Sequence, residues 1–198
     1  MAEVPIESPA FAPIEPKLHR TATDQRPIVV MTCGLSGSGK STLAKTITRH
    51  LPNFTRLSID AHIHQTHGLY KIDYPADKYG DYQDEARAAI TTELKTLLAR
   101  SERDVVLDLS FWNKAYREEY KTLIEGAGAR WVLVFLDAGR EVLWERVRKR
   151  REKRDALDEK DTGRDGDSAF DVDGDVFEMY LAGFERPDGE GEVVVPVI

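Results

Sequence analysis

The sequence predicts an α/β fold in which a parallel β-sheet is covered by helices on both faces. Two observations support this prediction. Five short apolar runs typical of buried strands alternate with segments of helical periodicity, and a glycine-rich turn joins the first run to the first helical segment. Because strands that alternate with helices pair in parallel, we expect ligands to bind at the carboxyl ends of the strands. A chain of 198 residues, 41% hydrophobic and 32% charged, has room for one well-packed domain.

The expected strands are short and rich in β-branched residues, and they lie at residues 28–33, 55–59, 104–109, 130–136 and 192–198. A first helix is expected at about 40–50, where Leu43 and Ile47 share a face and Pro52 follows. Apolar side chains at helical spacing predict further helices at about 81–100, 113–125, 140–154 and 176–184. A loop is expected to link Asp60 to the second helix.

The N-terminus has the composition of an unpacked segment. The first 27 residues hold five of the nine prolines and show no helical or strand period. We therefore expect a flexible, proline-rich leader over residues 1–26 and one folded domain over residues 27–198.

Charge and cysteine content narrow the functional classes. A formal net charge of -7 and a pI near 5.3 repel a polyanion at long range, so nucleic acid is a disfavoured partner unless a local basic patch binds it. No apolar run is long enough to cross a membrane, and the N-terminus lacks a secretion signal. The single cysteine, Cys33, cannot form an internal disulfide, which favours a reducing compartment: the cytoplasm by default, or the nucleus. We expect Cys33 to be a core residue and not a nucleophile.

The stretch "GLSGSGKST", residues 34–42, satisfies the pattern G-x-x-x-x-G-K-[ST] of P-loop NTPases. It follows an expected strand and opens an expected helix, so consecutive backbone N–H groups and the positive end of the helix converge on one anion. The pattern predicts a bound nucleoside triphosphate, with Lys40 at its β- and γ-phosphates and Ser41 at Mg²⁺. The expected nucleotide-binding residues are Gly34, Ser36, Gly37, Ser38, Gly39, Lys40, Ser41 and Thr42.

Two aspartates follow other expected strands. Asp108 ends the buried run "VVLD", where a P-loop protein needs a second acid to hold Mg²⁺ with Ser41. Asp60 follows "RLSI", about one helix beyond Lys40, where a carboxylate can accept the proton of an acceptor hydroxyl. For each aspartate, a capping or turn role is the alternative.

A basic run, "ERVRKRREKR" at residues 145–154, places seven basic side chains in ten positions. Arg146, Arg150 and Arg154 share one face of the expected helix. Because the following segment is rich in Asp and Gly, we expect a mobile lid over about 150–174 that brings arginines to the nucleotide. A solvated helix face or a nucleic-acid patch is the alternative.

The motifs "GLSGSGKST", "RLSID", "VVLDLSFWNKAYREEY" and "VFLDAGREVLWERVRKR" resemble those of a family of small P-loop kinases. This is the AAA-type ATP-binding family related to polynucleotide kinase, zeta toxin, gluconate kinase and chloramphenicol phosphotransferase, and the resemblance covers most of residues 28–154. It implies an adenylate-kinase-like three-layer sandwich, with a five-stranded parallel sheet in the order 2-3-1-4-5 and a helical lid. It also implies ATP and Mg²⁺ as phosphate donor and a hydroxyl compound as acceptor.

The same resemblance implies residue roles. By position in the motifs, Lys40 and Ser41 bind phosphate and magnesium, Asp60 is the general base, Asp108 is the acid after the third strand and Arg150 is the lid arginine. The chain ends on its last expected strand, so no following loop is expected to hold the adenine. Base recognition is therefore assigned to the basic run or to the "ERPDG" turn at 185–189, with Arg146 and Arg150 as the expected nucleotide ligands.

We therefore expect an ATP-dependent kinase that transfers the γ-phosphate to a hydroxyl of a small-molecule or nucleotide-like acceptor. A polynucleotide 5'-hydroxyl kinase and a non-catalytic ATP-dependent switch are the alternatives. The acceptor is expected between the loop after Asp60 and residues 110–113, where Phe111 and Trp112 are either core side chains or a stacking surface.

Three histidines in the same loop, His62, His64 and His67, have a spacing that suggests a metal site. No carboxylate or cysteine other than Asp60 accompanies them at ligand spacing, so contacts with the acceptor or plain exposure are the favoured interpretation.

Overall fold

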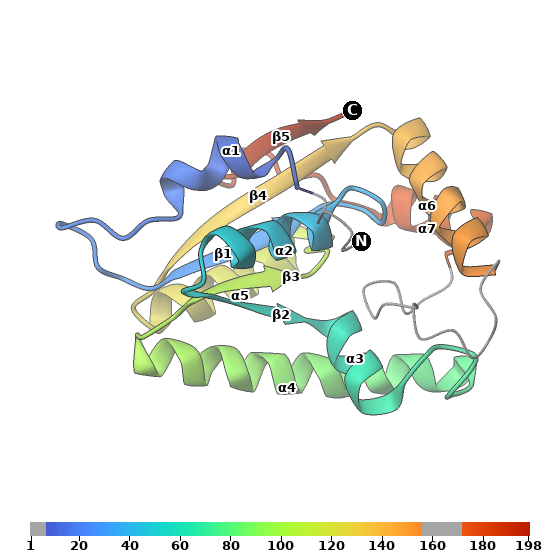
Figure 1. Ribbon diagram of the computed structural model, residues 1–198, viewed down its shortest axis with the longest axis horizontal. Coiled ribbons are helices and arrows are strands. Elements are labelled where there is room, and N and C mark those ends of the chain that lie inside the picture. Colours follow the sequence, from blue (N-terminus) through green and yellow to red (C-terminus); the bar gives the residue numbers. More distant parts are fainter. Residues whose placement is uncertain (1–6, 156–171) are drawn as a thin grey trace, which may run out of the picture.

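Five parallel strands form one sheet at the centre of the molecule (Figure 1). The computed structural model describes residues 7–155 and 172–198. The strands lie in the order β2-β3-β1-β4-β5, and their bounds are Phe54–Ser58 for β2, Asp104–Asp108 for β3, Ile28–Cys33 for β1, Arg130–Ala138 for β4 and Val193–Val197 for β5. The expected fold class and strand order are confirmed, and each expected strand lies within two residues of its observed bounds.

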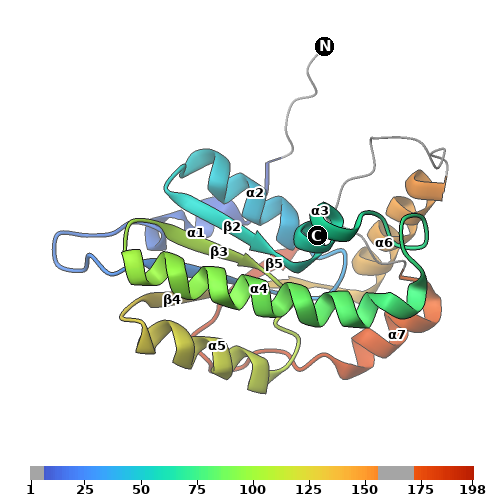
Figure 2. The same ribbon diagram turned by 90° about the horizontal axis from the view of Figure 1, so that it is seen from below.

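Helices cover both faces of this sheet. On one face lie α1, Phe11–Ile14, and α2, Lys40–His50; on the other lie α4, Tyr79–Arg100, and α5, Lys114–Gly126 (Figure 1 and Figure 2). Strand β1 shows why: all six of its residues are buried, and alternate side chains enter two different apolar clusters. Met31 packs with residues of α4 and α5, and Val30 packs with residues of α1 and α2. No helix in the described part of the chain is long and apolar enough to span a bilayer.

Three further helices gather beyond the carboxyl ends of the strands, where the arrowheads point in Figure 1. They are α3, Ile59–His67, α6, Arg140–Asp155, and α7, Gly174–Gly183. Of the lid expected over 150–174, residues 156–171 lie outside the described residues. The described part of that segment supplies the end of α6 and the start of α7, where Asp173 Oδ1 accepts a hydrogen bond from Val176 N at 2.9 Å and caps the helix.

The loop expected after Asp60 begins instead as a helix. Ser58 Oγ accepts a hydrogen bond from Ala61 N at 3.3 Å and caps α3, which continues to His67 and is anchored by the buried Ile63. The prediction of a loop is wrong for this part, because only one buried side chain marks the helical period and no periodic pattern reveals it. A short 3₁₀ helix, η2, Ala76–Lys78, then leads into α4.

The N-terminal leader is also packed. Residues 1–6 lie outside the described residues, but α1 and the 3₁₀ helix η1, Glu15–Lys17, bring four buried apolar side chains onto the face of the sheet that α2 covers: Ala10, Phe11, Ile14 and Leu18. The backbone N of Ser8 donates to Thr46 Oγ1 in α2 at 3.0 Å. The prediction of a flexible leader is wrong for residues 8–18, because prolines are tolerated in the first turn of short helices and do not prevent their burial.

Candidate active site

The loop between β1 and α2 is shaped to enclose an anion. Gly34, Gly37 and Gly39 adopt φ angles of 145°, 88° and 98°, a backbone region in which side chains are strained. A Cβ on Gly37 would lie 2.9 Å from the carbonyl oxygen of Leu143, so this glycine lets α6 approach the loop. The buried Ser38 Oγ finds no hydrogen-bond partner among the described residues. An oxygen of a bound phosphate chain would supply one.

Lys40 and Ser41 begin α2 at the end of this loop. Lys40 Nζ donates to the carbonyl oxygen of Leu35 at 2.9 Å, which folds the side chain back over the loop. Burial lowers the pKa of Lys40, and the carboxylates of Asp108 and Asp60 act in the opposite direction. The lysine is thus a partly buried cation with two acids nearby, and a phosphate chain would compensate its charge.

Ser41 and Asp108 are brought together as the sequence predicted. Ser41 Oγ donates to Asp108 Oδ1 at 3.3 Å, because β3 is the neighbour of β1 and both strands end at the same edge of the sheet. A hydroxyl and a carboxylate are ligands that Mg²⁺ accepts, either directly or through its water shell, so these two residues fit the ion.

Arg56 is a residue of this site that the sequence did not indicate. Its Nε and Nη2 atoms donate to Asp108 Oδ2 at 3.0 and 2.6 Å. The contact depends on the register of two neighbouring strands, in which Arg56 lies opposite Val106, two positions before Asp108. The only signal in the sequence is a cation between Thr55 and Leu57 in the expected strand.

Asp60 lies in the first turn of α3, at the same edge of the sheet, among tyrosines. The hydroxyl of Tyr79 donates to Asp60 Oδ1 at 3.5 Å. Burial and then the Asp60 carboxylate raise the pKa of Tyr79, and the same two causes, in the same order, raise the pKa of Tyr180 in α7. The charge of Asp60 in α3 thus acts on the hydroxyls of Tyr79 in α4 and Tyr180 in α7, and Tyr70, in the segment after α3, also contributes to the shift of Tyr180.

Two arginines of α6 reach the phosphate loop. Arg150 Nη2 donates to Ser36 Oγ at 3.0 Å, and Arg146 Nη1 donates to the Gly37 carbonyl at 3.3 Å. Arg146 Nη2 also donates to the carbonyl of Ile198 at 2.9 Å, so this arginine joins the loop to the segment after β5. Other cations of the basic run pair along the helix, Arg148 with Glu152 and Lys149 with Glu145. Arg146 and Arg150 therefore contact the phosphate loop, whereas Arg148 and Lys149 lie on the exposed side of the helix.

Phe111 and Trp112, which follow β3, take different environments. Phe111 is fully buried in the cluster under α4 and α5, whereas Trp112 is 48% exposed. The "ERPDG" turn expected as an alternative base-binding segment holds Arg186, whose guanidinium binds Asp137 at the end of β4 with two contacts of 2.8 Å and lies over the ring of Phe135.

The remaining chemistry-bearing side chains serve packing. Cys33 is buried, its Sγ donates to the Phe111 carbonyl at 3.4 Å, and burial raises its pKa to about 11, so it is a core thiol as expected. His67 stacks on Tyr82 and its Nε2 lies 3.0 Å from Glu85 Oε2. Within the described residues, no group of three or more potential ligands forms a metal site.

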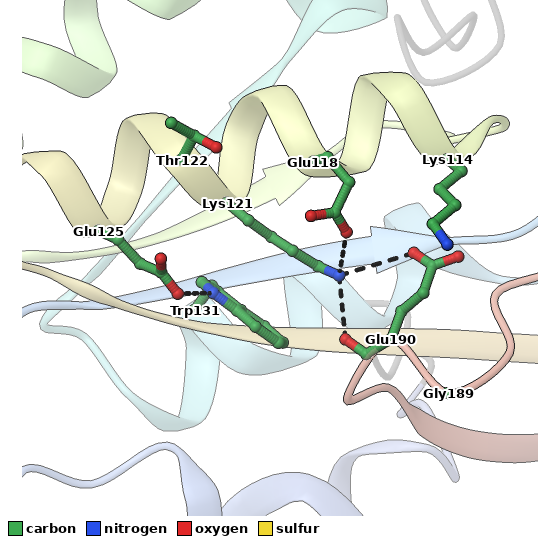
Figure 3. A pocket seen from close by; sticks show the side chains of 8 residues that line it. All are labelled: Lys114, Glu118, Lys121, Thr122, Glu125, Trp131, Gly189 and Glu190. Carbon is green, nitrogen blue, oxygen red and sulfur yellow. Dashed lines mark hydrogen bonds and ion pairs between the residues drawn. The ribbon is translucent and has the colours of Figure 1, made fainter.

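A hollow of about 370 Å³ lies between α5, Trp131 of β4 and residues 189–190, apart from the residues above (Figure 3). Its most buried cation, Lys121, donates to Glu118 Oε1 at 2.8 Å and to the Glu190 carbonyl at 2.9 Å, and its ammonium lies 4.7 Å from the centre of the Trp131 ring. These contacts of Lys121 with Glu118 and Glu190 connect the segment before β5 to α5.

The strand order, the glycine loop between β1 and α2, and Asp108 at the end of β3 define a P-loop NTPase fold. The chain belongs to the family of AAA domains designated AAA_33, whose model matches residues 29–187. This confirms the family that the sequence motifs predicted. No curated protein matches the chain significantly.

Solved structures share the fold at low sequence identity. Chaetomium thermophilum Kti12 in complex with ADP-AlF3 is 19% identical, with a TM-score of 0.62 over 85% of this chain and 88% of that one. The Pnkp1/Rnl/Hen1 RNA repair complex contains a chain 20% identical, with a TM-score of 0.61 over 83% of this chain and 44% of that one. Mycobacterium tuberculosis APS kinase CysC in complex with AMPPNP and APS is 20% identical, with a TM-score of 0.52 over 86% and 88%. At these identities, the similarities show that the chain shares the fold of these proteins.

Proposed function

We propose that this protein is an ATP-dependent kinase that transfers the γ-phosphate to a hydroxyl of a small-molecule or nucleotide-like acceptor. One observation carries the proposal: Ser41, which follows the glycine loop, donates to Asp108 at the end of β3 at 3.3 Å, and a second acid, Asp60, lies at the same edge of the sheet in the first turn of α3. Asp108 is engaged by Ser41 and Arg56, whereas Asp60 lies in a separate helix among tyrosine hydroxyls. The acid beside the P-loop serine can hold the metal ion, and the second acid, in a separate helix, can accept a proton from the acceptor hydroxyl.

The residues of the chain divide the reaction between them. The backbone N–H groups of the loop and the first turn of α2 bind the phosphates, and Lys40 and Arg150 neutralise their charge. Ser41 and Asp108 would hold Mg²⁺, which supplies further neutralisation of the phosphate oxygens when bound. Asp60 accepts the proton of the acceptor hydroxyl while the new P–O bond forms and the bond between the β- and γ-phosphates breaks, and ADP leaves.

The test measures ADP release from Mg-ATP over a panel of alcohols: nucleosides, sugars, sugar nucleotides, hydroxylated antibiotics and a 5'-hydroxyl oligonucleotide. We expect one class to stimulate release. Lys40→Ala should abolish the stimulation, and Asp60→Asn should abolish it while ATP binding remains. Asp84→Asn changes an exposed aspartate of α4 and should have no effect. Full stimulation in the Asp60→Asn protein would refute the role of Asp60.

The panel also tests the alternatives. Stimulation by the 5'-hydroxyl oligonucleotide alone would establish a polynucleotide kinase, against which the net charge of -7 argues. Tight ATP binding without stimulation by any alcohol would favour a nucleotide-dependent switch. A cytoplasmic location belongs to the same proposal, supported by the single cysteine, which cannot form an internal disulfide.

A further inference from the structure

Three large apolar side chains are exposed close together at the carboxyl edge of the sheet. Trp112 is 48% exposed, Met179 60% and Tyr180 38%. A Cβ built on Gly183 would lie 4.0 Å from the Trp112 ring, so the last turn of α7 packs directly beside the indole. Positions 179, 180 and 183 fall within an arc of about 100° on a helix, so Met179 and Tyr180 face the same side as that contact. We refer to Trp112, Met179 and Tyr180 as the aromatic surface.

The backbone beneath Trp112 is strained and fixed. Phe111 has a φ of 44°, which a bulky residue adopts only when its surroundings impose it. The Phe111 carbonyl accepts hydrogen bonds from Arg117 Nη1 at 3.0 Å and from Cys33 Sγ at 3.4 Å, and the Trp112 carbonyl accepts one from Glu185 N at 2.9 Å. These contacts fix the backbone that carries the indole, which is half exposed although burial of its ring would be favourable. Strain of this kind concentrates where a ligand binds.

The aromatic surface lies at the same edge of the sheet as Asp60. Ser58 at the end of β2 lies opposite Asp108 at the end of β3, so Asp60, two residues after Ser58, and Trp112, four residues after Asp108, follow neighbouring strands. Tyr79, which donates to Asp60, and Tyr70, whose ring centre lies 5.5 Å from that of Tyr79, place further aromatic rings beside that carboxylate. In Figure 1 and Figure 2, α3 and α7 lie at the same end of the sheet. A molecule that presents a hydroxyl to Asp60 therefore has aromatic rings within its reach.

We propose that Trp112 and Tyr180 stack on a planar ring of the acceptor, so that the substrate class is an alcohol joined to an aromatic or heteroaromatic ring, of nucleoside-like build. This inference rests on the kinase function proposed above. Two rigid aromatic side chains provide large contact area at low entropic cost, and the thioether of Met179 adapts to the edge of a ring. Stacking accepts any ring with a π-face, so the surface selects the class of compound and leaves the exact ring to other contacts.

The experiment compares ring-bearing alcohols with matched ring-free ones. Adenosine, uridine and a hydroxylated aromatic antibiotic are set against methyl riboside and glycerol. Binding is measured by calorimetry in the presence of Mg-ADP, and turnover by ADP release from Mg-ATP. We expect ring-bearing alcohols alone to bind and react. Trp112→Leu should raise KM for the acceptor by about tenfold or more with little change in kcat, because the lost contact is made equally in ground and transition states.

Two tryptophan-to-phenylalanine variants serve as controls for this experiment. Trp112→Phe keeps an aromatic face and should retain most of the affinity. Trp131→Phe changes a tryptophan in the hollow on α5 and should behave as the unaltered protein. Thermal unfolding of Trp112→Leu shows whether it is folded. If it is not, the comparison of ring-bearing with ring-free alcohols in the unaltered protein still decides the proposal.

The outcomes separate this inference from the kinase proposal. Turnover of ring-free alcohols with equal efficiency, or an unchanged KM in Trp112→Leu, would overturn the stacking role while the kinase stands. Trp112-dependent binding of ring-bearing alcohols without any turnover would support the aromatic surface and overturn the kinase. Binding of no alcohol would overturn the inference.

Discussion

Arg56 binds Asp108 through two guanidinium nitrogens, Nε and Nη2, which lie 3.0 and 2.6 Å from the same carboxylate oxygen. The other oxygen of Asp108 accepts the Ser41 hydroxyl at 3.3 Å. Only 3% of the Asp108 side chain and 17% of the Arg56 side chain are exposed. The acid that we assign to magnesium is therefore oriented from the β2 side by a largely buried cation that compensates its charge.

We predict that Arg56→Ala lowers the free energy of unfolding by about 3 kcal/mol, because it leaves a buried carboxylate without its main partner. Denaturant unfolding measures the loss. The double variant Arg56→Ala/Asp108→Asn removes the unpaired charge and should recover part of that stability. A loss below about 1 kcal/mol in the single variant, the range of an exposed ion pair, would contradict the prediction.

Arg150 and Arg148 lie on the same helix but should differ in their effect on catalysis. Arg150 donates to Ser36 of the phosphate loop, whereas Arg148 pairs with Glu152 on the exposed side of α6. We predict that Arg150→Ala reduces kcat on the order of 10²–10³-fold, the effect of removing one charge-stabilising donor. Arg148→Ala should stay within about twofold, since exposed i,i+4 pairs contribute little. Steady-state kinetics with the identified acceptor measures both, and equal effects would refute the distinction.

The N-terminal segment should contribute to stability. Ile14 is fully buried against the side of the sheet that α2 covers. We predict that Ile14→Ala lowers the free energy of unfolding by about 2–5 kcal/mol, the usual effect of truncating a core side chain. Lys17→Ala, at an exposed position three residues later, is the matched control and should change it by less than about 0.5 kcal/mol. Similar values for the two variants would mean that the segment is not part of the core.

Features that depend on local sequence were predictable, and features that depend on pairing between distant residues were not. The strands and the phosphate loop carry their own signals: apolar runs in the one case, glycines before Lys40 in the other. The contact of Ser41 with Asp108 followed because parallel strands end at one edge. Arg56 could not be assigned, since its role depends on the register of β2 against β3.

Two further differences have local physical causes. The separation of Phe111 from Trp112 depends on a positive φ at a non-glycine residue, which no sequence pattern predicts. The leader was misjudged because its prolines suggested disorder, whereas the spacing of its apolar side chains at 11, 14 and 18 is that of a packed helical segment.

The ion pair between Arg117 and Glu190 should make stability depend on pH. Glu190 accepts from Arg117 Nε at 2.7 Å and from Nη2 at 2.6 Å, and this hydrogen bonding lowers the pKa of Glu190 below its ordinary value of 4.5. A carboxyl whose pKa is lower in the folded state stabilises that state above its unfolded pKa, and the contribution is lost as the pH falls through the folded pKa. The pair should therefore stabilise fully at pH 7 and weaken progressively below about 4.5.

We predict that Glu190→Gln lowers the free energy of unfolding at pH 7 by about 3 kcal/mol, because Arg117 is fully buried and loses its counterion. As the pH falls below about 4.5, the unaltered protein should lose stability faster than the variant, and the two should converge. Unfolding curves from pH 7 to pH 3 measure this, with Glu118→Gln as the control at an exposed carboxylate of the same cluster. Parallel pH profiles for Glu190→Gln and the unaltered protein would show that the pair is not the titrating element. Arg117 also donates to the carbonyl of Phe111, the residue before Trp112. Glu190→Gln should therefore also weaken acceptor binding if Arg117 fixes the backbone that carries the indole.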